Sequence, residues 1–245
     1  MSHPFELRFD NAIGTYDALW NFSGRLACDP KVGNVNNWIL TFRDGLRGML
    51  ARIVAVDQNY SKLHEYQLQS PPDGNPNEWV LHCESHAAVI FFAMDSALEC
   101  FVFAMNVIGF LRSPQDFRDI TDPGALRKIR PRDILGGGRN PTPRYEAVFP
   151  RTVAHWRANE TLLSAIFEYH DVSKHRAALV TGGDGEGLRV KDNPKQHGAG
   201  MSSAVHTVES MAHSFQKFID EVLVIAVEEA TAAFGYAAIQ RTPIK

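Results

Sequence analysis

The residues best suited to chemistry in this sequence lie together in one short stretch. It contains two imidazoles, one carboxylate and two cations: His170, Asp171, Lys174, His175 and Arg176. Imidazoles donate and accept protons near neutral pH, and clustered cations suit phosphate or carboxylate groups. The stretch therefore predicts a site for proton transfer, for binding of an anion, or for both.

These groups continue the apolar stripe of a predicted helix. Leu163 and Phe167 lie on one row at steps of four residues, and the same row reaches Asp171 and His175. His170 ends a neighbouring row. Burying such groups without partners costs several kcal/mol, so we expect them to be paired, to line a cavity or to bind a ligand.

A second apolar helix carries polar groups of its own. Asp95, Glu99 and Asn106 form a row in the otherwise apolar segment 87–111. We expect Asp95 or Glu99 to face His170 or His175. Two interpretations stay open, because a buried carboxylate–imidazole network can fix helix register without catalysis, or can form a functional site.

The spacing from His170 to His175 resembles the motif of HEPN domains. In these all-α bundles an arginine precedes a histidine by four to six residues, and a polar residue often follows the arginine. Here His170 occupies the place of the arginine and Asp171 the polar position. The resemblance covers residues 78–235.

This resemblance implies a protein that acts on or binds RNA or a nucleotide, with no metal cofactor and as a homodimer. It makes His175 the proton-transfer group, with His170, Asp171 and Lys174 in support. Arg176 would add positive charge for phosphate.

Two resemblances imply a divalent transition metal instead. The motif His170-Asp171-x-x-Lys174 is similar to the central motif of HD-domain phosphohydrolases. The ligands implied are His170, Asp171, an upstream His86 or His155, and a downstream Asp220. A helical carboxylate–histidine site of the di-iron type is a further alternative. Its residues would be His86, Glu99, His170, Asp171 and His175. A non-catalytic interaction protein is the remaining alternative.

Positive charge gathers in one part of a weakly acidic chain. The formal net charge is −3, so no general attraction to nucleic acid or anionic lipid is expected. Residues 112–151, however, hold nine Lys or Arg against five acids, which is locally +4. This stretch is either a face that holds phosphate or a solvated, salt-bridged connection.

Composition favours a cytoplasmic protein. There are three cysteines, they form no CxxC pair, and a disulfide framework is not expected. The first ten residues lack the order of a signal peptide. Segment 87–111 is apolar, but Asp95 and Glu99 near its middle would be expensive in lipid. We therefore expect a buried core helix and no membrane partner.

Periodicity and breaks predict an all-α fold, a bundle of about five to six helices. We expect one domain over residues 1–245, with N-terminal helices within 10–68, a core bundle over 77–235 and an irregular Pro/Gly-rich insert at 112–150. The predicted helices span 10–28, 36–66, 77–111, 151–158, 159–180 and 203–235. A small β-hairpin is expected near 181–190.

Overall fold

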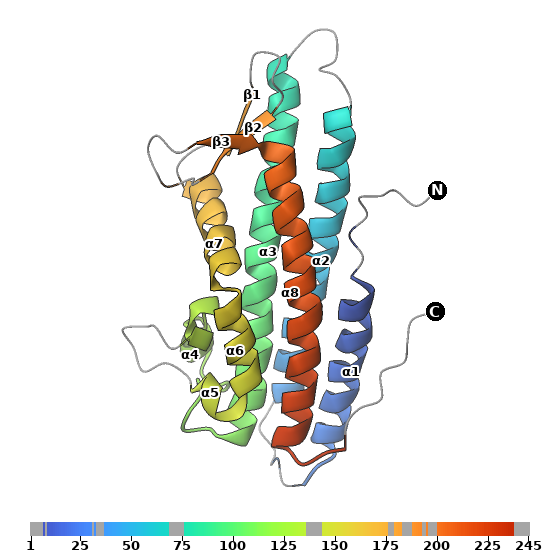
Figure 1. The fold of residues 1–245 in the computed structure, drawn as a ribbon. Helices are drawn as coiled ribbons and strands as arrows, with labels where there is room; N and C mark the ends of the chain where they lie inside the picture. Colours follow the sequence, from blue (N-terminus) through green and yellow to red (C-terminus); the bar gives the residue numbers. More distant parts are fainter. Residues whose placement is uncertain are drawn as a thin grey trace. The chain divides into compact units, whose positions relative to one another are not determined.

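Long segments with helical periodicity form helices in the computed structural model of the protein (Figure 1). The structure describes residues 7, 9–30, 32, 37–68, 76–135, 144–175, 179–182, 188–192, 195 and 200–237. Within these ranges the α-helices are α1 (Asp10–Ala27), α2 (Trp38–Leu68), α3 (Pro76–Arg112), α4 (Pro123–Leu126), α5 (Tyr145–Val148), α6 (Pro150–Ala158), α7 (Glu160–His175) and α8 (Ala204–Ala233). They are joined by the 3-10 helix η1 (Pro131–Leu135) and the strands β1 (Val180–Gly182), β2 (Leu188–Lys191) and β3 (Met201–Ser203).

The fold class is all-α, as the sequence predicts. The chain divides into two compact units. Unit 1 contains Met1–Arg8, Arg52–Ser96 and Thr161–Lys217, and unit 2 contains Phe9–Ala51, Ala97–Glu160 and Phe218–Lys245. The expectation of a single domain over 1–245 stays a prediction.

Unit 1 combines parts of α2, α3 and α8 with α7 and a small sheet. The strands lie in the order β1-β2-β3 and both pairs are antiparallel, with Val180 opposite Val190 and Val190 opposite Ser202. The predicted hairpin is therefore present, with a third strand added. The first strand begins at Val180, shortly after α7 ends at His175.

The predicted end of α7 is wrong by several residues. The sequence predicts that this helix ends at Val180, but α7 ends at His175 and Val180 belongs to β1. The β-branched Val180 and Thr181 favour a strand once the three-stranded sheet offers backbone partners.

Unit 2 is built around the second half of α3, which is buried on most of its surface. Phe101, Val102 and Ile108 are at most 1% exposed. The irregular insert packs on this helix: an added Cβ at Gly109 would lie 2.1 Å from the Phe117 ring. Gly109 is therefore needed for the insert to approach so closely.

A buried carboxylate joins α8 to the start of α6 in unit 2. Glu229 accepts hydrogen bonds from the amides of Arg151 and Thr152, at 2.7 and 2.9 Å, and from the Thr152 hydroxyl at 2.7 Å. The first amides of a helix have no partner within it, and an anion there also complements the helix dipole. Glu229 thus caps α6 from another helix.

Among the helices in the described residues, α3 is long and apolar enough to cross a membrane by length and composition, over Asn77–Arg112. Of its most apolar window, 56% is buried within the structure. This burial fits the core helix that the sequence predicts.

Candidate functional site

A carboxylate of α3 and an imidazole of α7 form the candidate site in unit 1. His170 Nδ1 is hydrogen-bonded to Asp95 Oδ2. The two side chains are only 14% and 16% exposed. The expectation that Asp95 would face His170 is confirmed. Two sequence-distant ionisable groups satisfy each other, as the energetic argument requires.

The hydrogen bond fixes the orientation of the His170 ring. A carboxylate accepts but does not donate when ionised, so Nδ1 of a neutral His170 must carry the proton. Nε2 is then an acceptor with a free lone pair. No described residue forms a hydrogen bond with Nε2. The Ser173 hydroxyl bonds the His170 backbone carbonyl at 2.9 Å instead.

An aromatic side chain lies against this imidazole. The ring centroid of Phe92 is 5.4 Å from that of His170, in an edge-to-face arrangement. Phe92 is 50% exposed, so part of its side chain is open to solvent. The pair thus borders a surface that can offer both a ring and a proton acceptor to a ligand.

Tyr169 anchors α7 next to His170. Its ring stacks on Phe91, with centroids 4.7 Å apart, and its hydroxyl donates to the Lys191 carbonyl at 2.7 Å. Burial, with the nearby Asp192 carboxylate, raises the pKa of Tyr169 to about 12. The hydroxyl therefore remains a donor at neutral pH and ties α7 to the sheet.

Two further contacts hold the α3 side of the site. The Arg52 Nε donates to the Ser96 hydroxyl at 2.7 Å, directly beside Asp95. Glu84 accepts from the backbone amide of Leu179 at 2.8 Å. Sequence reasoning missed these residues, because neither the pairing of Arg52 with Ser96 nor that of Glu84 with a backbone amide leaves a periodic signal.

The other predicted residues of the motif lie outside this pair. Asp171 forms an ion pair with Lys195 at 3.3 Å and is 39% exposed. Lys174 is exposed, one helical turn beyond His170. α7 ends at His175, but the His175 side chain and Arg176 lie outside the described residues.

Glu99 does not continue the buried row. Its side chain is exposed, so the expectation that it faces the core is wrong. Four residues turn a helix by about 400°, which rotates Glu99 about 40° from Asp95. That rotation is towards the exposed side that Phe92 also occupies.

The residues of the metal alternatives have other partners. His86 Nδ1 lies 2.9 Å from Asn59 Oδ1, while Asp171 pairs with Lys195. In unit 2, His155 stacks on Phe218, with centroids 5.2 Å apart. Among the residues that the structure describes, no three His, Cys, Asp or Glu side chains form a group that could hold a metal ion. Asp220 also belongs to unit 2.

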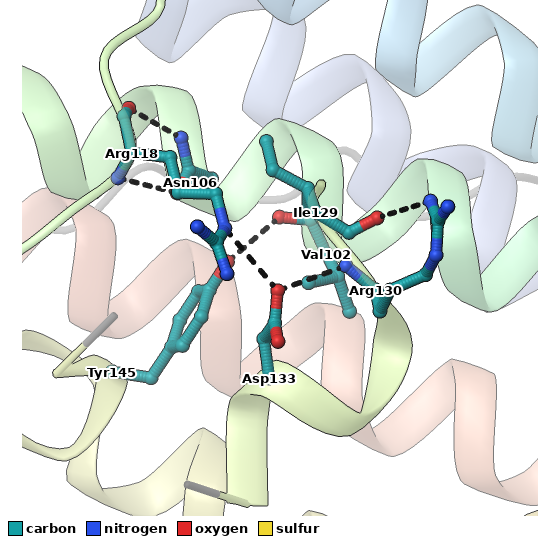
Figure 2. A network of polar contacts seen from close by, with 7 residues as sticks. All are labelled: Val102, Asn106, Arg118, Ile129, Arg130, Asp133 and Tyr145. Carbon is teal, nitrogen blue, oxygen red and sulfur yellow. Dashed lines mark hydrogen bonds and ion pairs between the residues drawn. The ribbon is translucent and has the colours of Figure 1, made fainter. Parts of the chain in front are cut away.

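A second polar cluster lies in unit 2 (Figure 2). Asn106 of α3 donates to the Arg118 carbonyl at 3.0 Å and accepts from the Arg118 amide at 3.1 Å. Asp133 accepts from the Arg130 amide at 3.0 Å and lies 3.5 Å from Arg118 Nε. The buried Tyr145 hydroxyl donates to the Val102 carbonyl at 3.3 Å.

This network fastens the insert to α3. Asn106 is fully buried and Asp133 is 8% exposed. Asn106 of the predicted polar row on α3 is therefore buried, but its partner is the backbone of Arg118. Its amide oxygen and nitrogen both have partners, which fits a structural role.

Several cations of the insert are salt-bridged, as one interpretation of the sequence expects. Arg118 pairs with Asp133, Arg144 with Asp116 at 3.6 Å, and Arg151 with Glu228 at 2.9 Å. Arg112 donates to the Ala233 carbonyl at 2.9 Å. The four cations between residues 127 and 132 are exposed.

Comparisons with known protein families, with curated proteins and with solved structures give no match to this chain.

Proposed function

We propose that this chain is a HEPN-like helical protein that cleaves RNA without a metal ion, with His170 as the proton-transfer group and Asp95 as its positioning partner. The observation that carries the proposal is the buried hydrogen bond between Asp95 and His170 Nδ1. It gives the main role to His170, whose ring Asp95 orients. The sequence predicts that role for His175, whose side chain lies outside the described residues.

The chemistry follows from the tautomer. With Nδ1–H donated to Asp95, the Nε2 lone pair can accept the proton of a ribose 2′-hydroxyl. The 2′-oxygen then attacks phosphorus and the bond to the 5′-oxygen breaks, which leaves a 2′,3′-cyclic phosphate. The 5′-oxygen takes a proton from water. The Asp95 carboxylate stabilises the imidazolium that forms.

Two neighbours of the pair suit a nucleotide. Phe92 exposes an aromatic ring beside His170, and bases stack readily on such rings. Lys174 is exposed one turn along α7, where its ammonium can attract a phosphate. The same residues fit a protein that binds a nucleotide without cleaving it, so catalysis must be tested directly.

The test is cleavage of unstructured RNA in excess EDTA by the purified protein and three variants. We expect His170→Gln to lower the cleavage rate by about 10²- to 10⁴-fold, the usual contribution of a positioned acid or base. Asp95→Asn should lower it by roughly 10-fold or more. His206→Gln, which changes an exposed histidine of unit 1, should leave it unchanged.

Melting temperatures of the same variants separate catalysis from packing. If His170→Gln lowers only the melting temperature and RNA cleavage persists, the Asp95–His170 pair fixes helix register and the proposal is wrong. Cleavage that requires an added divalent metal would likewise contradict it.

A further inference from the structure

Four cations of the insert in unit 2 form a short surface that we call the basic ridge. It consists of Arg127, Lys128, Arg130 and Arg132, all of which are exposed. Ile129 and Pro131, between them, are buried. The apolar residues therefore anchor the segment in unit 2, and the cations are directed to solvent.

The backbone of the basic ridge is held by hydrogen bonds. The amides of Arg127 and Lys128 donate to carbonyls of the short α4 turn, at 3.2 and 3.0 Å. Asp133 accepts from the Arg130 amide at 3.0 Å, and the Asp133 amide donates back to the Arg130 carbonyl at 2.9 Å. Figure 2 shows the first of these bonds, from the Arg130 amide to Asp133. A segment fixed in this way loses little entropy when it binds a ligand.

Three of the four cations of the basic ridge have no carboxylate partner among the described residues. Within the described residues, Arg127, Lys128 and Arg130 form no ion pair, and the Arg130 guanidinium donates to the Ile129 carbonyl. The nearby acids have other roles: Asp119 bonds Thr121 and Asp122 caps α4. Uncompensated like charges repel one another, so their retention in a rigid segment favours a role in binding.

We propose that the basic ridge binds the phosphodiester backbone of a single-stranded RNA. Three of its four cations are arginines, whose planar guanidinium groups match phosphate oxygens in pairs. Such contacts position a nucleic acid without reading its sequence. The ridge therefore supplies affinity that depends on salt and not on base identity.

The surroundings of the basic ridge favour nucleic acid over a protein or a membrane. The exposed large apolar residues of the described chain are Ile13, Leu40, Val54, Leu81, Val89, Phe92 and Met201. None belongs to the insert. Protein interfaces have an apolar or aromatic centre, and membrane-binding segments insert apolar side chains, whereas phosphate contacts need cations alone.

The choice of RNA as ligand rests on the proposed function, but the measurement does not. We would use a fluorescent 2′-O-methyl oligouridylate of about sixteen nucleotides, which has no free 2′-hydroxyl and cannot be cleaved by the proposed route. Binding is followed by fluorescence anisotropy at several salt concentrations, with the intact chain. A failure to cleave RNA would thus leave this inference untouched.

The ridge variant combines Arg127→Gln, Lys128→Gln and Arg130→Gln. Single-stranded nucleic acids lose about 0.7 in the slope of log K against log salt for each phosphate contact removed. We therefore expect the slope to fall by about 2, and binding near physiological salt to weaken on the order of 10-fold or more.

A matched control removes the same charge from the same unit. Arg144, Arg151 and Arg157 are at least half exposed and already paired with carboxylates, so Arg144→Gln, Arg151→Gln and Arg157→Gln together should weaken binding much less. Equal losses in the two triple variants, or a ridge variant that binds like the wild type, would overturn the proposal. Ridge-dependent binding of polyglutamate as tight as that of the oligonucleotide would also overturn it, in favour of an acidic protein partner.

Discussion

The two polar clusters of α3 differ in what their buried polar groups contact. In unit 2, Asn106 uses both its amide oxygen and its nitrogen on Arg118, and Asp133 bonds Arg130 and pairs with Arg118. Arg118 Nε has this ion pair at 3.5 Å and no hydrogen bond among the described residues. In unit 1, Asp95 bonds His170 through Nδ1 only, and Nε2 has no described partner. A buried network that holds neighbouring backbone fixes structure, whereas an oriented, titratable group with an open atom suits chemistry.

The largest stability effect is expected in the structural cluster. Asp133→Ala removes the partner of a buried guanidinium, since the Arg118 and Asp133 side chains are only 14% and 11% exposed. Breaking such a pair should lower the free energy of unfolding by about 3 kcal/mol. Urea denaturation measures the change.

Asp133→Ala also tests whether the cluster in unit 2 is structural while the Asp95–His170 pair in unit 1 is catalytic. If the unit 2 cluster is structural, folded Asp133→Ala protein at low temperature should keep a cleavage rate near that of the wild type at saturating RNA, while its RNA affinity falls because the Arg130 backbone loses its clamp. A variant that is as stable as the wild type but inactive would reverse the roles we give to the two clusters.

The next largest loss of stability is expected when the side chain that caps α6 is removed. Glu229→Ala leaves two helix amides and the Thr152 hydroxyl without their acceptor, so the free energy of unfolding should fall by about 2 kcal/mol. Its neighbour is a matched control: Glu228 is 45% exposed and forms a surface ion pair with Arg151. Glu228→Ala should change stability by less than about 1 kcal/mol. Equal losses in the two variants would argue against a specific capping role.

Two buried tyrosines, one in each unit, allow a direct comparison of the two clusters. Tyr169→Phe removes the donor to Lys191 in unit 1, and Tyr145→Phe removes the donor to Val102 in unit 2. Each should lower the free energy of unfolding by about 1 kcal/mol. Because Tyr169 anchors α7 beside His170, only Tyr169→Phe should also slow RNA cleavage. Similar cleavage rates in both variants would separate α7 anchoring from the activity.

Hydrophobic periodicity predicts most of the fold and one contact of the site. The long helices follow from their apolar rows, and the pairing of Asp95 with His170 follows from the cost of burying either alone. Glu99 could not be placed, because a rotation of about 40° decides between a buried and an exposed position. Which position Glu99 takes depends on the segments that pack against α3, and the sequence does not specify them.

Contacts that depend on how distant elements align could not be predicted from the sequence. The clamp of Asn106 on Arg118, and the cap that Glu229 provides for α6, join elements whose alignment no local pattern specifies. The charge-rich insert was predicted as a single feature. The structure divides it into salt-bridged arginines and the basic ridge, since only packing decides which cations find carboxylates.

The smallest effect concerns a histidine outside both clusters. The groups around His86 are Asn59, Tyr66, His82, Lys62 and Glu65. Burial, then the neighbouring cations, lowers the pKa of His86 below its usual 6.5. The unfolded chain then binds the proton more tightly, so stability should fall as pH drops below about 6.5.

His86→Gln should flatten this acid-side loss while keeping a polar partner for Asn59. Urea denaturation of both proteins between pH about 7 and 5 measures the difference. Identical slopes would show that other groups cause the loss.

The most direct test of the central claim is the protonation of the His170 ring, measured by NMR on protein with ¹⁵N-labelled histidine and assigned with His170→Gln. In the neutral ring we predict the proton on Nδ1, a low-field Nδ1 proton signal that disappears in Asp95→Asn, and no proton on Nε2. A neutral ring with its proton on Nε2, or signals that Asp95→Asn leaves unchanged, would contradict the account.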